Sequence, residues 1–170
     1  MKLNKLTLIA AAAVAFSGTA LAATDGLLGL TSTGSSVVTL IKENAVQISG
    51  VADLDLGTHS SLVTDATASD DVCVFSATSL YQITVTSANG AFELSDGTNT
   101  IDYSMTWAAG GAAAPVTYNT AMTTLPANST APTCGGVDNA TFEVTVASAD
   151  FNAAAPGTYT DTVTLLVEPE

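Results

Sequence analysis

Two cysteines, one histidine and 16 carboxylates are the side chains of this 170-residue sequence that could take part in chemistry. Cys73 and Cys134 are too far apart for a zinc site, which needs about four ligands at short spacings. General acid–base catalysis most often uses histidine, and His59 stands alone in a turn-like segment. No Gly-x-Ser-x-Gly motif and no glycine-rich phosphate loop accompany it. We therefore expect no enzyme activity, no metal site, no cofactor and a surface position for His59.

The charge balance excludes two classes of partner. Only Lys2, Lys5 and Lys42 are basic, and the first two precede the predicted cleavage site described below. The chain after that site has one lysine against 16 carboxylates, and therefore a formal charge of −15. Such a surface repels nucleic-acid phosphates and anionic lipid headgroups. We expect no nucleic-acid binding and no direct membrane anchor.

The N-terminus has the pattern of a secretory signal peptide. Lys2 and Lys5 form a positive start, an apolar run covers residues 6–16, and small residues end at Ala22. A membrane span would need about 20 apolar residues, and polar residues interrupt this run earlier. The pattern predicts a leader over residues 1–22, cleaved between Ala22 and Ala23. The chain is therefore expected to be exported.

Export gives the two cysteines a structural role. An oxidising compartment favours one intramolecular disulfide between Cys73 and Cys134. The chain-entropy model credits a bridge across so long a loop with about 4 kcal/mol. A metal-bound or nucleophilic thiol is the weaker interpretation.

Alternating apolar and polar residues predict strands along most of the remaining chain. Asn89-Gly90 is a strong tight-turn signal, and almost nothing reads as helix. About seven short strands at intervals near ten residues favour an antiparallel sandwich. The expected strands include a run from Val37 to Ile41, a second from Ala45 to Leu56, Val72–Phe75, Leu80–Ser87, Phe92–Leu94, Ile101–Trp107, Phe142–Val146 and Tyr159–Val167.

The two ends of this predicted sandwich are unusual. The last strand runs nearly to Glu170, so no later segment is expected to pair with its outer edge. The segment after the leader has no obvious hairpin partner, and its even positions carry apolar side chains at both ends with small residues between them. At about 3.3 Å per residue, this face could reach about 40 Å along a neighbour's sheet edge. Its main members are Leu28, Leu30, Gly34, Val38 and Leu40.

Several segments together resemble the pilin subunits of chaperone–usher pili. They are the leader, the Ser/Thr/Gly-rich arm over residues 23–42, and four stretches in residues 43–170, namely Val46–Gly57, Tyr81–Thr84, Ile101–Met105 and Gly157–Leu165. The resemblance is nearest to the archaic branch, which shares the spore-coat-protein-U-like domain. Members of that branch usually carry a cysteine in the first strand, near the position of Ala45, whereas the pair here is Cys73 and Cys134.

The resemblance implies an incomplete immunoglobulin-like sandwich that lacks its last strand, formed by residues 43–170. It implies a groove that a periplasmic chaperone fills first and the N-terminal arm of the next subunit fills later, with an outer-membrane usher assembling a fimbrium on a Gram-negative cell for adhesion or biofilm formation. The physical basis is β-strand addition. The donor residues would be Leu28, Leu30, Gly34, Val38 and Leu40, and the acceptor groove would be lined by Val46, Ile48, Tyr159, Val163, Leu165 and Val167.

Each of these interpretations has an alternative. The arm could be a disordered linker, and Trp107 could be a core residue or a platform for stacking sugars. The pair Asp53 and Asp55, or the pair Asp70 and Asp71, could suggest calcium, but no EF-hand spacing accompanies them, so solvated loop carboxylates are favoured. As a whole, the chain could instead be a secreted monomeric binding module or a matrix protein of the spore-coat-U type.

Overall fold

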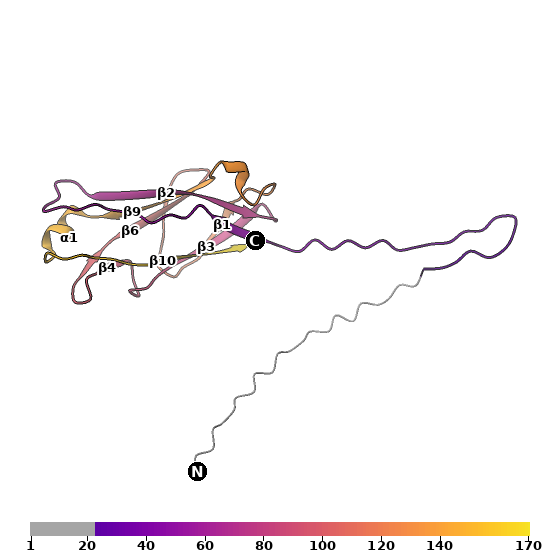
Figure 1. The fold of residues 1–170 in the computed structure, drawn as a ribbon, viewed down its shortest axis with the longest axis horizontal. Coiled ribbons are helices and arrows are strands. Elements are labelled where there is room, and N and C mark those ends of the chain that lie inside the picture. Colours follow the sequence, from indigo (N-terminus) through magenta and orange to yellow (C-terminus); the bar gives the residue numbers. More distant parts are fainter. Residues whose placement is uncertain (1–22) are drawn as a thin grey trace, which may run out of the picture. The chain divides into compact units, whose positions relative to one another are not determined.

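The computed structural model describes residues 23–170, so the predicted leader over residues 1–22 lies outside the described residues. The chain divides after Lys42 into two units, which are described separately here. The described part of the first unit is residues 23–42, referred to below as the arm. The second unit, Glu43–Glu170, contains every named strand (Figure 1).

The second unit is built almost entirely of strands. Two short helical segments, η1 and α1, lie between its last strands. The elements in chain order are β1 Val46–Ser49, β2 Ala66–Ser76, β3 Leu80–Ser87, β4 Glu93–Ser95, β5 Thr100–Asp102, β6 Ser104–Ala109, β7 Ala114–Pro115, β8 Met122–Pro126, η1 Cys134–Gly136, β9 Ala140–Val146, α1 Ser148–Ala153 and β10 Val163–Pro169.

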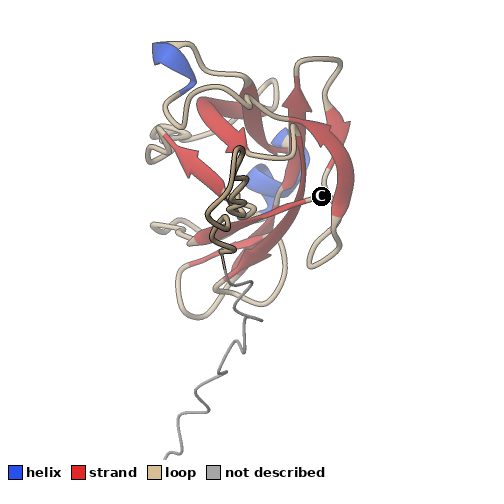
Figure 2. Ribbon diagram, turned by 90° about the vertical axis from the view of Figure 1, so that its right-hand side faces the viewer, coloured by secondary structure: helices blue, strands red, loops and turns tan. Residues whose placement is uncertain are grey.

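Two antiparallel sheets pack into a sandwich, which confirms the fold class predicted from the sequence and is consistent with an immunoglobulin-like fold. One sheet has the strand order β1-β2-β9-β6-β7 and the other has the order β10-β3-β8. A separate β4-β5 hairpin lies at one end (Figure 1). Figure 2 shows the strands of the domain in red from a second direction. β10 is therefore an edge strand of its sheet.

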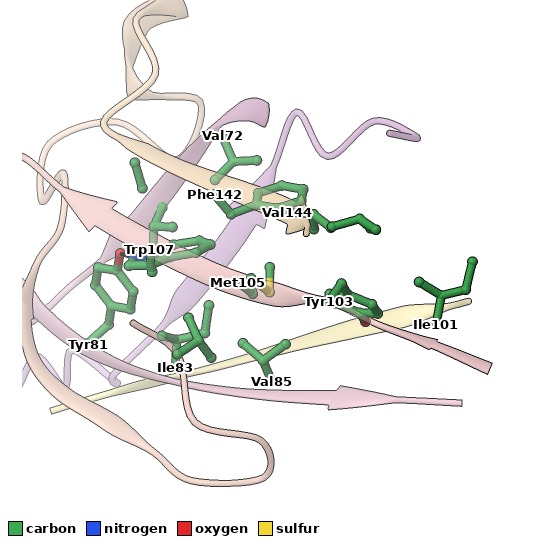
Figure 3. Packing of buried hydrophobic residues seen from close by; sticks show 14 residues of the cluster. Val72, Tyr81, Ile83, Val85, Ile101, Tyr103, Met105, Trp107, Phe142 and Val144 are labelled. Atoms are coloured by element: carbon green, nitrogen blue, oxygen red, sulfur yellow. Dashed lines mark hydrogen bonds between the residues drawn. The ribbon is translucent and has the colours of Figure 1, made fainter. Parts of the chain in front are cut away.

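Strict alternation along the central strands builds the core between the sheets. In β3, Tyr81, Ile83 and Val85 are buried while the residues between them are half-buried. β9 repeats the pattern with Phe142 and Val144. Because successive side chains of a strand point to opposite faces, each sheet presents one apolar face, and the two faces meet (Figure 3).

A hydrogen-bonded aromatic pair lies within this core. The indole Nε1 of Trp107 donates to the hydroxyl of Tyr81 at 2.9 Å, and the two rings meet edge to face (Figure 3). Trp107 is 1% exposed and stacks on Phe142 from β9. Its burial identifies it as a core residue rather than a platform for sugars.

The predicted disulfide is confirmed. Cys73 in β2 is bonded to Cys134 at the start of η1, and both residues are buried. The Asn139 side chain adds two hydrogen bonds to the backbone of Val74, one step along β2. The bridge and these bonds hold the long loop before β9 against the sheet.

Several strand boundaries differ from those predicted. β2 begins at Ala66, well before the expected Val72, because its first half pairs with β9 along a continuous register. The expected strand from Ile101 to Trp107 is divided at Tyr103 into β5 and β6. β5 pairs with β4, and β6 pairs with β9. The pattern did not predict α1, a helix of 6 residues.

Tyr81→Phe is expected to lower the free energy of unfolding by about 1–3 kcal/mol, because it leaves the buried Trp107 N–H without an acceptor. Urea unfolding followed by the fluorescence of Trp107 measures the change. Tyr118→Phe is the matched control, because no hydrogen bond is found for the Tyr118 hydroxyl within residues 23–170. Equal stabilities of the two variants would contradict the assignment.

Replacing both Cys73 and Cys134 by Ala is expected to lower the free energy of unfolding by about 4 kcal/mol, the chain-entropy value for a loop of this length. The sequence separation of the two residues is 61. Comparing the variant with the oxidised and the reduced wild-type protein in urea separates the loss of the bond from the loss of side-chain volume. A reduced wild-type protein as stable as the oxidised one would refute this expectation.

Candidate functional site

The outer edge of β10 is the most unusual feature of the domain. β10 pairs with β3 along its whole length, from Val163 opposite Ser87 to Pro169 opposite Tyr81. No strand of the described chain pairs with its other edge. An edge strand with unpaired N–H and C=O groups is a template for pairing with another chain.

An apolar cleft of about 310 Å³ lies beside this edge. We call it the β10 cleft. One wall comes from the start of β10 and the residues before it, the other from the segment 51–56, and the floor from β9 and the β4–β6 region. The lining residues are Val51, Ala52, Asp53, Leu54, Leu56, Leu94, Tyr103, Phe142, Val144, Asp161, Thr162, Val163 and Leu165.

The opposite wall of the cleft is also short of backbone partners. Residues 51–56 belong to no strand, and no backbone-to-backbone hydrogen bond involves them within residues 23–170. The segment is held by side chains instead. The Ala52 N–H donates to the Asp70 carboxylate at 2.7 Å, and the Leu56 carbonyl bonds to Nε2 of His59 at 2.8 Å. The cleft thus lies between two lengths of backbone that can still form hydrogen bonds.

β1 and residues 51–56 run alongside β10 in the antiparallel direction. Cα atoms of β1 and β10 approach within 8 Å, although the two strands share no ladder. In Figure 1, β1 lies near the C-terminal end of β10. The segment 51–56 then faces Asp161 to Leu165, around the beginning of β10. A strand inserted antiparallel to β10 would therefore run parallel to residues 46–56.

Two carboxylates, Asp53 and Asp161, are the only charged residues of the cleft lining. Oδ2 of Asp161 accepts hydrogen bonds from the hydroxyls of Tyr103 and Ser87, each at 2.6 Å. The Thr162 N–H donates to Oδ1 of Asp161 at 2.7 Å. These donors fix the position of the Asp161 carboxylate at the end of the cleft.

Burial raises the pKa of Tyr103 far above its ordinary value, and the hydrogen bond to Asp161 and the charge of Asp161 raise it further. The tyrosine hydroxyl therefore stays protonated and remains the donor at neutral pH. Asp161 has no cationic neighbour to compensate it within its own domain, because Lys42 is the single Lys or Arg of residues 23–170 and belongs to the arm.

The residues predicted to form the groove occupy two kinds of position. Val163 and Leu165 line the cleft. The other four are half-buried against the core and do not line the cleft. Val46 and Ile48 belong to β1, Val167 belongs to β10, and Tyr159 precedes β10. The Tyr159 hydroxyl donates to the Ala155 carbonyl at 2.8 Å.

The sequence interpretation missed most of the cleft lining, since only Val163 and Leu165 of the lining residues were predicted to form the groove. Leu54 and Leu56 alternate with Asp53 and Asp55, and this pattern was available as a signal for an apolar face opposite β10. Asp161 lay within the expected strand Tyr159–Val167, on the same face as Val163 and Leu165, but nothing in the sequence pattern indicated the partners of its carboxylate. Its role becomes visible only through Tyr103, 58 residues away in the sequence.

All five predicted donor residues are exposed in the arm. Thr24 and Ser35 pair in an antiparallel bridge, with reciprocal backbone hydrogen bonds of 3.0 Å. Leu28 and Leu30 lie in the bend that this bridge closes, and Gly34 lies just before Ser35. Val38 and Leu40 follow in a stretch with no backbone partner among the described residues.

The remaining candidate residues lie apart from the cleft lining. His59 is exposed and its ring meets Phe151 edge to face. Among residues 23–170, no group of three or more His, Cys, Asp or Glu side chains is placed to hold a metal ion. The helices of this part of the chain are also too short or too polar to cross a membrane.

No family model and no curated protein matches the chain. Among solved structures, it is similar to a chain from a structure described as a chaperone–tip adhesin complex vital for synergistic activation of CFA/I fimbriae biogenesis. The identity is 16% and the TM-score 0.57, over 74% of this chain and 41% of that chain. At this identity the likeness shows a shared fold, and the match spans less than half of the solved chain.

The free energy of unfolding is expected to fall as the pH rises above 10.0, the ordinary pKa of tyrosine. Burial raises the pKa of Tyr81 to about 12 and that of Tyr103 further. Above the ordinary value, the unfolded chain has lost protons that the folded chain keeps, so stability decreases with pH. The contribution of these residues is complete below pH 10.0 and is lost as the pH approaches the raised pKa values.

Urea unfolding at several pH values between about 9 and 12 measures this slope. In Tyr103→Phe the slope should be shallower, because one of the tyrosines with a raised pKa is absent. The same slope in the wild-type protein and the variant would contradict the assignment to Tyr103.

Proposed function

We propose that this protein is a structural subunit of a fimbrium that polymerises by donor-strand exchange. The observation that carries the proposal is the unpaired outer edge of β10 beside an apolar cleft. A β-strand inserted there would bond to β10 and place alternate side chains in the cleft, so that backbone pairing provides affinity and side chains set the register.

The arm of a second copy is the proposed occupant. Leu28, Leu30, Val38 and Leu40 are almost fully exposed. Each such side chain that the cleft of another copy buries would contribute roughly 1.5–3 kcal/mol before the cost of ordering the arm. One copy would give its arm and receive another in its cleft, and such heterologous contacts propagate a fibre when they do not close into a ring.

The proposal includes a periplasmic chaperone, because an apolar cleft beside an open strand edge needs cover before assembly. The chaperone–adhesin complex named for the solved neighbour is consistent with this partner. An outer-membrane usher, a place on the surface of a Gram-negative cell and a role in adhesion or biofilm formation complete the proposal. The archaic type of pilus is the subfamily that the sequence resemblance favours.

A monomeric carbohydrate-binding module has less support. Its main candidate contact was Trp107, whose ring lies within the core. The β10 cleft has unpaired backbone on both walls, an arrangement suited to a peptide strand.

Deletion of residues 23–41 in the producing bacterium is expected to abolish surface fibres while leaving a folded, exported subunit.

Leu40→Asp should lower fibre yield at least about tenfold, since burying an unpaired carboxylate costs several kcal/mol and about 1.4 kcal/mol corresponds to tenfold. Thr39→Asp, on the opposite face of an extended arm, is the matched control. Electron microscopy and heat-sensitive ladders in SDS electrophoresis give the yield. Normal fibres from the deletion variant would refute donor-strand exchange.

The acceptor side is tested by two adjacent leucines of β10. Leu165 lines the cleft, whereas Leu166 is 53% exposed and does not line it. In Leu165→Ala, the ladders should dissociate at a lower temperature, because the inserted strand loses apolar contact of roughly 1.5–3 kcal/mol. Leu166→Ala should behave like the wild-type protein. If both variants shifted equally, the β10 cleft would not be the acceptor.

A further inference from the structure

We propose that Lys42 of the inserted arm pairs with Asp161 of the receiving copy, and that this ion pair sets the direction and register of the arm in the β10 cleft. The inference rests on the proposed function, because it needs a second copy as the occupant. It adds which residues of the arm meet which residues of β10.

Charge complementarity is the first observation. The cleft is apolar except for its two carboxylates, Asp53 and Asp161. The arm ends in the one Lys or Arg of residues 23–170, placed two positions after Leu40. Asp161 is also held in place by the hydroxyls of Tyr103 and Ser87. A fixed carboxylate pairs with a cation at a smaller ordering cost than a mobile one.

The side-chain parity of the two segments is the second observation. Along β10, the odd positions are half-buried and the even positions are exposed. If Leu40 lies opposite Val163 in an antiparallel pair, two further pairs follow. Val38 then lies opposite Leu165 and Lys42 opposite Asp161. Directly opposite residues of an antiparallel pair have Cβ atoms about 4.5–5.5 Å apart, which a lysine and an aspartate can span.

Other arrangements leave a charge unpaired. In a parallel arm with Val38 and Leu40 opposite the same two β10 residues, Lys42 would lie opposite Val167. An antiparallel arm shifted by two residues would place Lys42 opposite Val163, within the apolar cleft. Burial of an unpaired ammonium group is costly, which disfavours the shifted arm. The parallel arm separates Lys42 from both carboxylates of the cleft lining.

The position of Lys42 in its own chain also fits. It is the last residue of the first unit, and Glu43 begins the domain. Asp161 precedes the first residue of β10 by two positions. In the antiparallel register, the arm therefore leaves the cleft at its acidic end, where the donating domain begins.

An ion pair at the rim of the cleft would act mainly on specificity and association rate. Exposed pairs contribute little to affinity, whereas opposite charges speed encounter and disfavour wrong registers. The remaining carboxylates repel one another between copies, so the single Lys or Arg of residues 23–170 favours the end of the cleft where Asp161 is held.

Engineered disulfides in the full-length protein test the register. Lys42→Cys with Asp161→Cys should give ladders that survive boiling in SDS without reductant and disappear with it. Lys42→Cys with Val163→Cys is the control for a shift by two residues, and Lys42→Cys with Val167→Cys is the control for a parallel arm. Stronger cross-linking of either control pair would overturn the proposal. The native cysteines are bonded to each other and buried.

The unmodified fibre provides a second measurement that does not depend on how the variants fold. A carbodiimide joins an amine to a carboxylate only when the two are in contact. Mass spectrometry of the digested, treated fibre should find Lys42 linked to Asp161 of another copy. Linkage of Lys42 to other carboxylates without Asp161 would refute the pairing.

Charge variants of the arm separate a role in pairing from a structural one. Lys42→Glu should slow fibre assembly about tenfold at low salt, with a smaller difference at high salt because the charges are screened. Lys42→Arg should assemble like the wild-type protein. Equal rates for Lys42→Glu and Lys42→Arg would overturn the inference while leaving donor-strand exchange intact. A wild-type protein that forms no fibres would instead refute the proposed function itself.

Discussion

The unpaired edge of β10 is the constraint on which the rest of this structure depends. A sandwich normally protects its strand edges with short strands, charges, bulges or cover. Here a seven-residue strand has a ladder on one side, and an apolar cleft lies along the other. The side chains of Val163 and Leu165 are only half-buried, because nothing within residues 43–170 covers the cleft. The domain leaves apolar surface exposed and backbone groups unpaired at the same place, and a single extended strand would satisfy both.

The core and the disulfide allow the cleft to remain open without loss of the fold. The floor of the cleft includes Phe142 and Val144 of β9, which pair on both sides with β2 and β6. Phe142 also stacks on Trp107, which donates a hydrogen bond to Tyr81 in the opposite sheet. These contacts connect the two sheets behind the cleft. The Cys73–Cys134 bond constrains the loop before β9. An acceptor that is already shaped loses less conformational entropy when a strand enters it.

Strands in which apolar and polar residues alternate strongly were predictable. Strands that form only because a distant strand pairs with them were not. β3 begins and ends where the sequence pattern placed it, because Tyr81, Ile83 and Val85 define one face without ambiguity. The first half of β2 consists of small and polar residues with little hydrophobic contrast. It is a strand because β9 pairs with it, which is a long-range contact that a local pattern does not contain.

The candidate site was predictable to a similar extent. Val163 and Leu165 follow from alternation, whereas the wall at Leu54 and Leu56 is irregular backbone held by the Asp70 side chain. The arm shows the same limit. The apolar positions of Val38 and Leu40 were visible in the sequence, but the bridge between Thr24 and Ser35 was not.

The charge distribution acquires a physical meaning from this geometry. With one lysine against 16 carboxylates in residues 23–170, neighbouring copies repel one another over most of their surface. Under the proposed function, most of the affinity between copies would therefore come from contacts that need no ion pairs, and backbone pairing with apolar side chains is such a contact. Strong general repulsion also disfavours lateral aggregation of exposed strand edges, which is the hazard of an open sheet. Under the proposed function, the same net charge favours end-to-end assembly, since the arm proposed to enter the cleft carries the single Lys or Arg of residues 23–170, at the boundary of the domain.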